Sequence, residues 1–540
     1  MRPSVPGDDS AATAVRPTRA PLVAPAALLL LVCGIFATGL PAGFVFDDHL
    51  DIVQNPAATA ATFFTALPTT VRPLLKASYA LNSAVHGAFA PGYRLVNIAL
   101  HLLTTLLVFV LIGRVLGAGR AARAWVPAAL AGAALWALHP SAVDTVTYIS
   151  GRSVGLSSAL LIGAFLLSTA GRRTSEPDVL AKLSAGARCA SAGLAEVPEH
   201  TRERRQARPR RSLPGPPGNV GGHVRPWGAA LGAGFCAFLA PLARETALIL
   251  PALLVLWQVT VAPRERWGDI VRRHAPIWIG VVAAAVVLAL LPRQRHLVEF
   301  SLQVRGPLDA LRGNLHAATA ILSMWARPWA ISIDPQAPVV WGWTEMPTLL
   351  RLIGVGAAVS VMVAMRRRWP VVAFAIGWTL LTLAPTNSFL WRLDPVAVRP
   401  LYLASIGPTL ALVLVLARLR PSRAVRWNLL AAVPAAGVIV ALASGTLIRN
   451  AQYRSPVALW EDAVKKSPGR SRPRVALALA YMDAGRLDAA EQQVMIAVDR
   501  EPWDQRAACV LDAVRIRRGA SLELAQDSQG FVNVRPEGSR

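Results

Sequence analysis

Long runs of apolar residues alternate with short polar connections along most of this chain. A helix needs about 20 apolar residues to cross a bilayer, so the pattern predicts about eleven transmembrane helices. The predicted spans are 21–41, 93–113, 124–139, 154–170, 227–243, 246–262, 276–292, 348–365, 370–386, 401–417 and 427–447. The expected fold class is therefore all-α, with a polytopic membrane domain over residues 21–450.

Arginine is distributed unevenly between the connections. Every second connection is rich in arginine, as at Arg366 and Arg367 after the eighth predicted span. Because cytoplasmic loops carry an excess of Lys and Arg, these connections are expected to be cytoplasmic. The N-terminal tail 1–20 is then inside and the C-terminus outside. This orientation requires 293–347 to stay on the outer side, with 314–331 as a surface or re-entrant helix.

The composition supports a membrane protein and argues against other classes. The 540 residues are 54% hydrophobic and 16% charged, which is too apolar for an ordinary soluble domain. Arginine in cytoplasmic loops explains the net charge of +25, so membrane lipid rather than nucleic acid is the expected partner. The four cysteines are scattered without the spacing of metal ligands.

The loop 171–226 differs in kind from the other connections. It contains RERRQARPRR followed by SLPGPPGNVGG. Much Arg, Pro and Gly with few large apolar residues predicts a disordered cytoplasmic loop. We interpret it as a solvated tether, and binding to anionic lipid headgroups is the alternative.

A repeat begins where the apolar runs end. Ala463 and Ala497 are 34 residues apart, which is the period of the tetratricopeptide repeat. Residues 451–520 are therefore predicted to form short tetratricopeptide-like repeats outside the membrane, followed by a disordered tail, 521–540. The residues expected at packing positions of the repeat are Leu477, Ala478, Tyr481 and Ala490. A plain helical hairpin is the alternative.

The outward connections hold nearly every unusual polar cluster. These clusters are GFVFDDHLDIVQNP (43–56), RPLLKASYALN (72–82), HPSAVDTVTYISGRS (139–153), LARETALILP (242–251) and TNSFLWRLDPVAVRPLYLAS (386–405). Charged groups at membrane depth are costly and are commonly functional. The clusters are therefore candidates for one site on the outer face.

The order of these motifs resembles the transmembrane and tetratricopeptide repeat proteins and their bacterial relatives. The matching segments are FVFDDH, RPLLKASYALN, GYRLVNIALHLL, LHP with YISGRS, RETALILP, and RNAQY with LWEDAVKKSP. That family is part of the GT-C group of polytopic glycosyltransferases, to which protein O-mannosyltransferases are related. The resemblance implies a GT-C-like transmembrane domain in a bacterial plasma membrane.

The resemblance also implies an activity. Such enzymes move a sugar, with mannose as one candidate, from a polyprenyl-phosphate donor to an acceptor hydroxyl, such as a protein Ser or Thr, at the extracytoplasmic face. Asp47 and Asp48 match the acid pair of the family. Asp47 is then expected to act as general base, because a carboxylate can take the proton of an attacking alcohol. Asp48 is expected to be its partner or a ligand to Mg²⁺ or Mn²⁺.

Other charged residues on the same side complete the expected site. Guanidinium groups hold phosphate oxygens bidentately, and the candidates for binding the donor phosphate are Arg244, Arg392, Arg399 and Arg152. Glu245 joins the catalytic candidates, and His139 is expected to orient the acceptor or the sugar. The alternatives are a helix cap at His139 and a local ion pair between Arg244 and Glu245.

The sequence departs from the family pattern within AVRPLYLAS. Val398 replaces an acid, Pro400 an aromatic residue and Ala404 a proline, whereas Arg399 is retained. Arg244 stands where the family has Lys, which keeps the charge but changes the geometry.

Two other functions fit parts of the pattern. A non-catalytic membrane scaffold would use the repeats to display a surface to a protein partner. In the enzyme, the same repeats would contribute to binding an acceptor protein or glycan. A transporter would carry polar or broken segments at mid-membrane, often in repeated sets of spans, and this sequence places its acids at the outer face instead.

Overall fold

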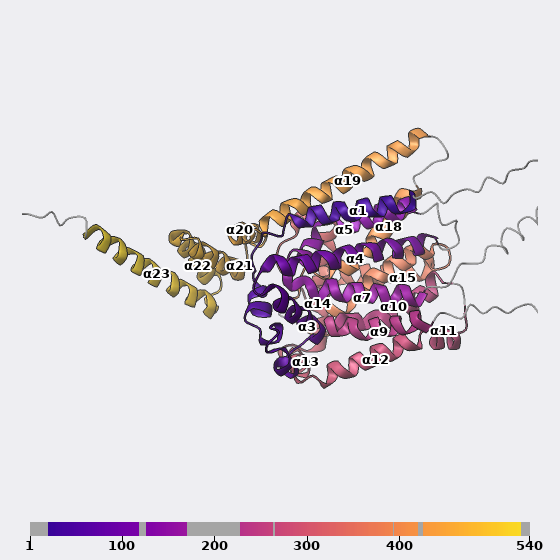
Figure 1. Ribbon diagram of the computed structural model, residues 1–540, viewed down its shortest axis with the longest axis horizontal. Helices are drawn as coiled ribbons and strands as arrows, with labels where there is room; N and C mark the ends of the chain where they lie inside the picture. The colour runs from indigo at the N-terminus through magenta and orange to yellow at the C-terminus, as the bar shows by residue number, and fades with distance from the viewer. Residues whose placement is uncertain are drawn as a thin grey trace, which may run out of the picture.

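Each segment predicted to span the membrane is helical in this computed structural model, which describes residues 20–117, 126–169, 227–262, 265–392, 394–418 and 425–530. Within these ranges the chain forms helices and no strands, which confirms the all-α fold class. The bundle helices are α1 (Ala20–Ala37), α4 (Ala90–Gly117), α5 (Val126–Ala137), α7 (Arg152–Thr169), α9 (Trp227–Ala243), α10 (Leu250–Thr260), α12 (Ala275–Leu290), α15 (Met346–Met365), α16 (Pro370–Leu383), α18 (Ile406–Arg418) and α19 (Val425–Gln452). They run side by side along the long axis of the molecule (Figure 1).

Length and apolar composition identify four candidate membrane spans within the described residues. These are α4, α7 with the turn before it, α15 and the second half of α19. The count rises to six if each of two bent helix pairs is one span, and five further helices are apolar but shorter. A membrane protein is therefore supported, whereas the count of eleven spans stays a prediction. The tail 1–19 and the loop 171–226 lie outside the described residues.

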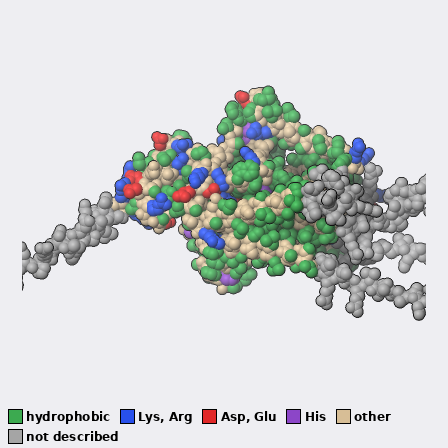
Figure 2. Space-filling model, turned by 90° about the horizontal axis from the view of Figure 1, so that it is seen from above, with side chains coloured by type: hydrophobic (Ala, Val, Ile, Leu, Met, Phe, Trp, Pro, Cys, Tyr) green, Lys and Arg blue, Asp and Glu red, His purple; other side chains and the backbone are tan. Residues whose placement is uncertain are grey.

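The helices α9 and α12 approach each other closely at two glycines. A Cβ atom on Gly280 would lie 2.3 Å from the carbonyl oxygen of Gly234, and a Cβ on Gly234 would lie 2.7 Å from the Pro276 carbonyl. No larger residue fits either position without moving the backbones apart. Small residues at helix contacts are typical of membrane bundles. The outer face of the bundle is largely hydrophobic, whereas charged side chains gather on the C-terminal helices (Figure 2).

Short elements connect the bundle helices at the end of the bundle where α3 and α13 lie (Figure 1). They are η1 (His49–Val53), η2 (Pro56–Ala58), α2 (Phe63–Ala66), η3 (Leu67–Thr69), α3 (Pro73–His86), η4 (Pro140–Ala142), α6 (Val143–Val146), η5 (Ile149–Gly151), η6 (Glu245–Ile249), α13 (Pro292–Val304), α14 (Pro307–Ala326), η7 (Pro328–Ala330), η8 (Ala384–Thr386) and α17 (Leu401–Ala404). The predicted outer connections form this end. At the opposite end, α11 (Trp267–Arg273) carries Arg272 and Arg273 in its last turn (Figure 1).

Four helices follow the bundle and form what we call the C-terminal helical unit. They are α20 (Pro456–Lys466), α21 (Ser471–Asp483), α22 (Leu487–Arg500) and α23 (Gln505–Gly530). Gly485 makes the turn between α21 and α22 with a φ of +74°, a conformation that favours glycine. The residues expected at packing positions of the repeat, from Leu477 to Ala490, are buried in one core. The helix α23 continues to Gly530, into the segment predicted to be a disordered tail.

Candidate functional site

The first outer connection contributes two acids with different surroundings. Asp48 is completely buried, and its Oδ1 accepts hydrogen bonds from the backbone N–H and the hydroxyl of Ser150 at 2.8 and 2.7 Å. Its Oδ2 accepts a hydrogen bond from the Val45 N–H at 3.1 Å. Burial raises the pKa of Asp48 from 3.8 to about 6. Asp48 therefore ties the first outer loop to the turn before α7 and does not face a substrate.

Buried arginines belong to the same closed region. Arg152 donates from Nε to the Asn97 side-chain oxygen at 2.8 Å. Its Nη1 and Nη2 groups donate to the carbonyl oxygens of Ser78 and Tyr93 at 3.1 and 2.8 Å. The N–H groups of Arg152 are thus already bonded to acceptors within the protein. This geometry does not support the predicted role of Arg152 in binding the donor phosphate. Arg94 is also buried and donates to three backbone carbonyl groups.

We call this closed region the buried polar network. Its members are Asp48, Arg94, Asn97, Ser150 and Arg152. Gly151 lies within it, and a Cβ there would come within 2.4 Å of the Asp144 carbonyl oxygen, so the turn has no room for a side chain. The network fixes the backbone from which Asp47 projects.

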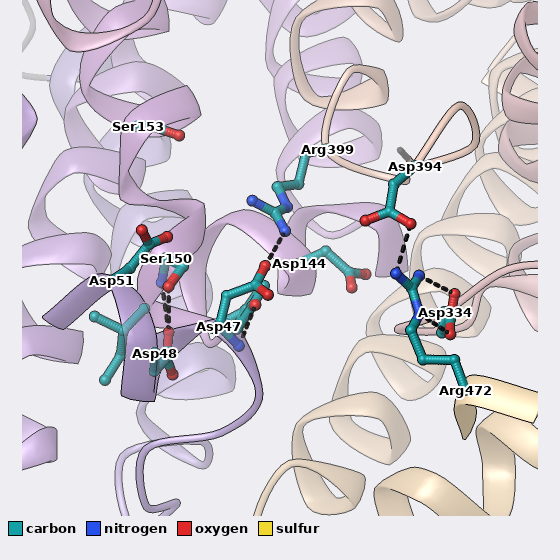
Figure 3. Close-up of polar contacts among 12 residues, drawn as sticks. Asp47, Asp48, Asp51, Asp144, Ser150, Ser153, Asp334, Asp394, Arg399 and Arg472 are labelled. Atoms are coloured by element: carbon teal, nitrogen blue, oxygen red, sulfur yellow. Dashed lines mark hydrogen bonds and ion pairs between the residues drawn. The ribbon is translucent and has the colours of Figure 1, made fainter. Parts of the chain in front are cut away.

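Asp47 faces the other way and is partly open. Its Oδ2 accepts a hydrogen bond from Arg399 Nη2 at 3.0 Å, and the two side chains remain 35% and 23% exposed (Figure 3). The Asp47 backbone N–H donates to the Tyr148 hydroxyl at 3.1 Å, and the Arg399 guanidinium lies over the Tyr148 ring at 5.0 Å. Phe46, just before it, has a positive φ of 50°, and such backbone strain outside glycine is concentrated at functional sites.

Arg399 belongs to what we call the cation cluster. Its members are Arg72, Arg244, Arg392 and Arg399. Glu245 is bound by Arg72, whose Nε and Nη2 groups reach its two oxygens at 2.9 and 2.8 Å. The local ion pair expected between Glu245 and Arg244 is therefore replaced by a bidentate pair from another loop. Arg72 also has a positive φ, of 59°.

The cation cluster carries more positive than negative charge. Glu245 and Asp47 are the carboxylates paired with its four guanidinium groups in the described residues. Burial, and then the nearby charge of Arg72, lowers the pKa of Arg244. The Nη1 atom of Arg392 is buried and has no hydrogen-bond partner in the described part of the chain. Such a cluster favours binding of an anion.

A cavity adjoins two members of this cluster. Its volume open to water is about 20 Å³, and its lining is Val154, Ser157, Ser158, Leu161, Arg244, Thr246, Ala247, Thr382, Thr386, Arg399, Pro400 and Leu403. Guanidinium and hydroxyl groups thus share the cavity with aliphatic side chains. A phosphate carried by a hydrocarbon chain presents both of these chemistries.

Part of the chain is similar to two protein O-mannosyl-transferases. Protein O-mannosyl-transferase Tmtc1 of Drosophila melanogaster is 33% identical over 147 residues, which are 24% of this chain and 16% of that protein. Protein O-mannosyl-transferase Tmtc2 of the same species is 36% identical over 135 residues, which are 22% of this chain and 14% of that protein. The chain thus matches only a small part of the length of these two relatives. No family model and no solved structure matches it.

His139, which was expected to orient the acceptor or the sugar, is bonded to neighbouring groups of the protein. It is the N-cap residue immediately before η4, and its Nδ1 accepts a hydrogen bond from the Ser141 N–H at 3.2 Å. Its Nε2 is bonded to the Trp325 carbonyl at 3.0 Å. The alternative of a helix cap is therefore confirmed, and both ring nitrogens are occupied within the protein.

The residues at the acid pair do not fit a divalent cation. Both Asp48 oxygens accept protein hydrogen bonds, and Asp47 pairs with Arg399, so neither offers the oxygen-rich shell that Mg²⁺ requires. Within the described residues, no group of three or more His, Cys, Asp or Glu side chains is placed to hold a metal. We therefore assign no step to a metal ion at Asp48.

The C-terminal helical unit contacts both loops that build the site. Arg472 of α21 donates to Asp334 at 2.7 and 2.6 Å and forms an ion pair with Asp394 at 2.6 Å (Figure 3). Asp394 lies five residues before Arg399 in the same loop. The Phe46 ring packs edge-on against Trp460 at 5.3 Å, with the Arg472 guanidinium 5.7 Å from its centre.

Sequence reasoning missed Arg72, Asp334 and Arg472. Arg72 opens the motif RPLLKASYALN, and its position before a proline that starts a helix was the available signal. Asp334 is completely buried although it is acidic and lies in an irregular segment. Only the fold shows that Arg472, more than 130 residues later, neutralises it.

Proposed function

We propose that this chain is a membrane glycosyltransferase that uses a polyprenyl-phosphate sugar, with mannose as one candidate, and transfers it to an acceptor hydroxyl at the extracytoplasmic face. The partial similarity to two protein O-mannosyl-transferases suggests a membrane glycosyltransferase. The observation that carries the proposal is the pair of Asp47 and Arg399 beside the cavity that Arg244 also lines.

Asp47 is proposed as the general base. A carboxylate in hydrogen-bond contact with an alcohol can take its proton as the alcohol attacks, which contributes about 10²–10⁴-fold to a rate. The ion pair with Arg399 holds the Asp47 carboxylate beside the cavity that Arg399 lines. Partial exposure leaves the second Asp47 oxygen accessible to an acceptor.

The cation cluster is proposed to hold the donor phosphate. As the acceptor oxygen bonds to the anomeric carbon, the bond from that carbon to the phosphate oxygen breaks and the electron pair leaves with the phosphate. The acceptor proton passes to Asp47. Guanidinium groups of Arg244 and Arg399 stabilise the negative charge on the leaving lipid phosphate. Arg392, with its unpaired Nη1, is placed to add a further donor.

The orientation rests on the arginine pattern and stays part of the proposal. With about eleven spans, the end of the bundle that holds Asp47 faces the extracytoplasmic side and the arginine-rich end faces the cytoplasm. The C-terminal helical unit is then extracytoplasmic. We propose a bacterial plasma membrane and an acceptor such as a protein Ser or Thr.

The test is sugar transfer by the full chain in lipid nanodiscs, with mannosyl phosphoryl polyprenol as donor and a Ser/Thr-rich peptide as acceptor. Asp47→Asn should lower the rate about 10²–10⁴-fold. Asp51→Asn is the matched control, because Asp51 lies four residues away, its side chain is 45% exposed, and its ion-pair partner in the described residues is Lys76. Equal transfer by wild type and Asp47→Asn would remove Asp47 as the base. No transfer by the wild type would favour a non-catalytic scaffold.

A further inference from the structure

A second groove lies between α14 and the first turns of α15. It is lined by His316, Thr319, Ala320, Ser323, Arg327, Pro338 and Arg351, and this open groove offers about 460 Å³ to water. The residues Ala317, Ile321 and Met324 of α14 pack instead in a core with Val396 and Val398. The groove is therefore separate from the cavity at Asp47.

Arg351 lies on a helix that is otherwise open to lipid. Its neighbours Leu350 and Ile353 are 59% and 66% exposed, and almost none of the apolar window of α15 is buried within the protein. Neither Arg351 nor Arg327 forms an ion pair with a carboxylate in the described part of the chain. A cation beside hydrocarbon without a counter-charge is costly. An anion supplied from outside the protein would remove that cost.

Hydrogen bonds orient both guanidinium groups at the groove. Arg351 donates from Nε to Thr319 Oγ1 at 3.1 Å and from Nη1 to the Pro347 carbonyl at 2.6 Å. Arg327 donates from Nη2 to Ser323 Oγ at 2.8 Å. The Nη2 group of Arg351 and the Nη1 group of Arg327 are left for a ligand. Fixed guanidinium groups with free N–H donors bind phosphate oxygens well.

A buried histidine in the lining also lacks a partner. His316 is completely buried, its Nε2 is bonded to Thr348 Oγ1 at 2.9 Å, and its Nδ1 has no hydrogen-bond partner in the described residues. An unsatisfied buried polar atom calls for an explanation, and a ligand or its water can supply one. The unpaired Nδ1 of His316, together with the free N–H groups of Arg327 and Arg351, indicates that the groove binds a polar group.

Exposed tryptophans place the groove at the edge of the membrane. Trp329 and Trp341 are 71% and 45% exposed and flank the segment that contributes Pro338. Tryptophan is enriched where headgroups meet hydrocarbon. At the far end of α15, Arg366 to Arg368 follow the last turn, so the groove lies at the opposite, outer end of this helix.

From these features we infer that the groove binds the phosphate of an anionic membrane lipid. The Arg327 and Arg351 guanidinium groups hold the phosphate oxygens, Thr319 and Ser323 lie beside them, and the acyl chains run along the exposed face of α15. This site is independent of sugar transfer. It gives the protein a fixed lipid beside α14, whose other face packs against Val396 and Val398 of the Arg399 loop.

Native mass spectrometry of the full chain released from detergent tests the inference, with phosphatidylglycerol as the probe and phosphatidylcholine and inorganic phosphate as comparisons. We expect the wild type to retain phosphatidylglycerol, and Arg327→Gln with Arg351→Gln to retain at least about tenfold less, since the phosphate loses both of its charged hydrogen-bond donors. Arg305→Gln is the control, because Arg305 is exposed, carries the same charge and does not line the groove.

Each outcome bears on the inference. Equal retention of phosphatidylglycerol by the wild type and the double variant would overturn it, as would equal loss in Arg305→Gln. Equal retention of phosphatidylcholine would overturn the preference for an anionic lipid, and tight binding of inorganic phosphate alone would point to a free anion instead. If the double variant does not fold, Arg327→Gln alone serves, because Arg327 is exposed and its described hydrogen bond is to Ser323 of the same helix.

Discussion

Asp47 and Asp48 are neighbours in the chain and lie in two regions of opposite character. The buried polar network around Asp48 is closed, and protein donors and acceptors occupy its groups. The cation cluster beside Asp47 is partly exposed, has excess positive charge and contains an unpaired buried donor at Arg392. Both regions contain buried arginine. The two regions differ in whether each charged group already has its hydrogen-bond or ion-pair partners within the protein.

This contrast separates structural from functional charge. A saturated group such as Arg152 stabilises one backbone arrangement, and its loss should lower stability without a specific effect on chemistry. An incompletely satisfied group such as Arg392, whose buried Nη1 has no hydrogen-bond partner in the described residues, lowers stability until a ligand binds it. Substitutions in the two regions should therefore give different readouts in the same assays.

Among the substitutions that compare the two regions, the largest effect is expected at Arg399. Arg399→Gln should lower the rate of sugar transfer about 10²–10³-fold, because it removes a guanidinium from the leaving phosphate and from Asp47. Its midpoint of thermal unfolding should stay near that of the wild type. Initial rates in nanodiscs and unfolding followed by tryptophan fluorescence measure the two quantities. A large fall in the midpoint with an unchanged rate would place Arg399 in the structural class.

The reverse result is expected at Arg152. Arg152→Gln leaves the carbonyl groups of Ser78 and Tyr93 without their donors, at a cost of about 1–3 kcal/mol for each buried group. The thermal midpoint should fall clearly, while the rate per folded molecule should change little at low temperature. A normal midpoint with a lost rate would instead return Arg152 to the donor site.

The buried acid should make stability depend on pH. The pKa of folded Asp48, about 6, lies above its ordinary value of 3.8, so the protonated form favours folding and this contribution is lost as the pH rises through about 6. Two pKa units correspond to about 3 kcal/mol. Asp48→Asn does not titrate, so its thermal midpoint relative to wild type should rise between about pH 4.5 and pH 7. A constant difference across this range would contradict the burial of an ionisable Asp48.

The smallest effect is expected at the contact of the C-terminal helical unit. Arg472→Ala should reduce transfer by about tenfold, because the loops of Asp47 and Arg399 lose a common support worth about 1.4 kcal/mol. Arg474→Ala is the matched control on the same helix, since Arg474 contacts Gln493 and the Pro468 carbonyl instead. Partial recovery in Arg472→Lys would support a positioning role, and equal rates in both alanine variants would exclude it.

The sequence predicted the helices better than the site. Apolar length located each bundle helix because burial in lipid or core requires long apolar runs. The sequence placed the loops of Asp47 and Arg399 on the same face, but it could not show that these two side chains pair, since their positions differ by 352. The sequence did not reveal that backbone carbonyl groups bond to Arg152 and His139, because it indicates the side of the membrane that a residue faces but not the groups that fold against it.

The contact between Phe46, Trp460 and Arg472 has a consequence for engineering. The C-terminal helical unit cannot be exchanged as a whole, because its helices α20 and α21 contact Phe46, the residue next to Asp47. A chimera that carries another repeat array should keep α20 and α21 and join after Asp483. The turn at Gly485 is then the first position where a new array can begin without disturbing Asp47.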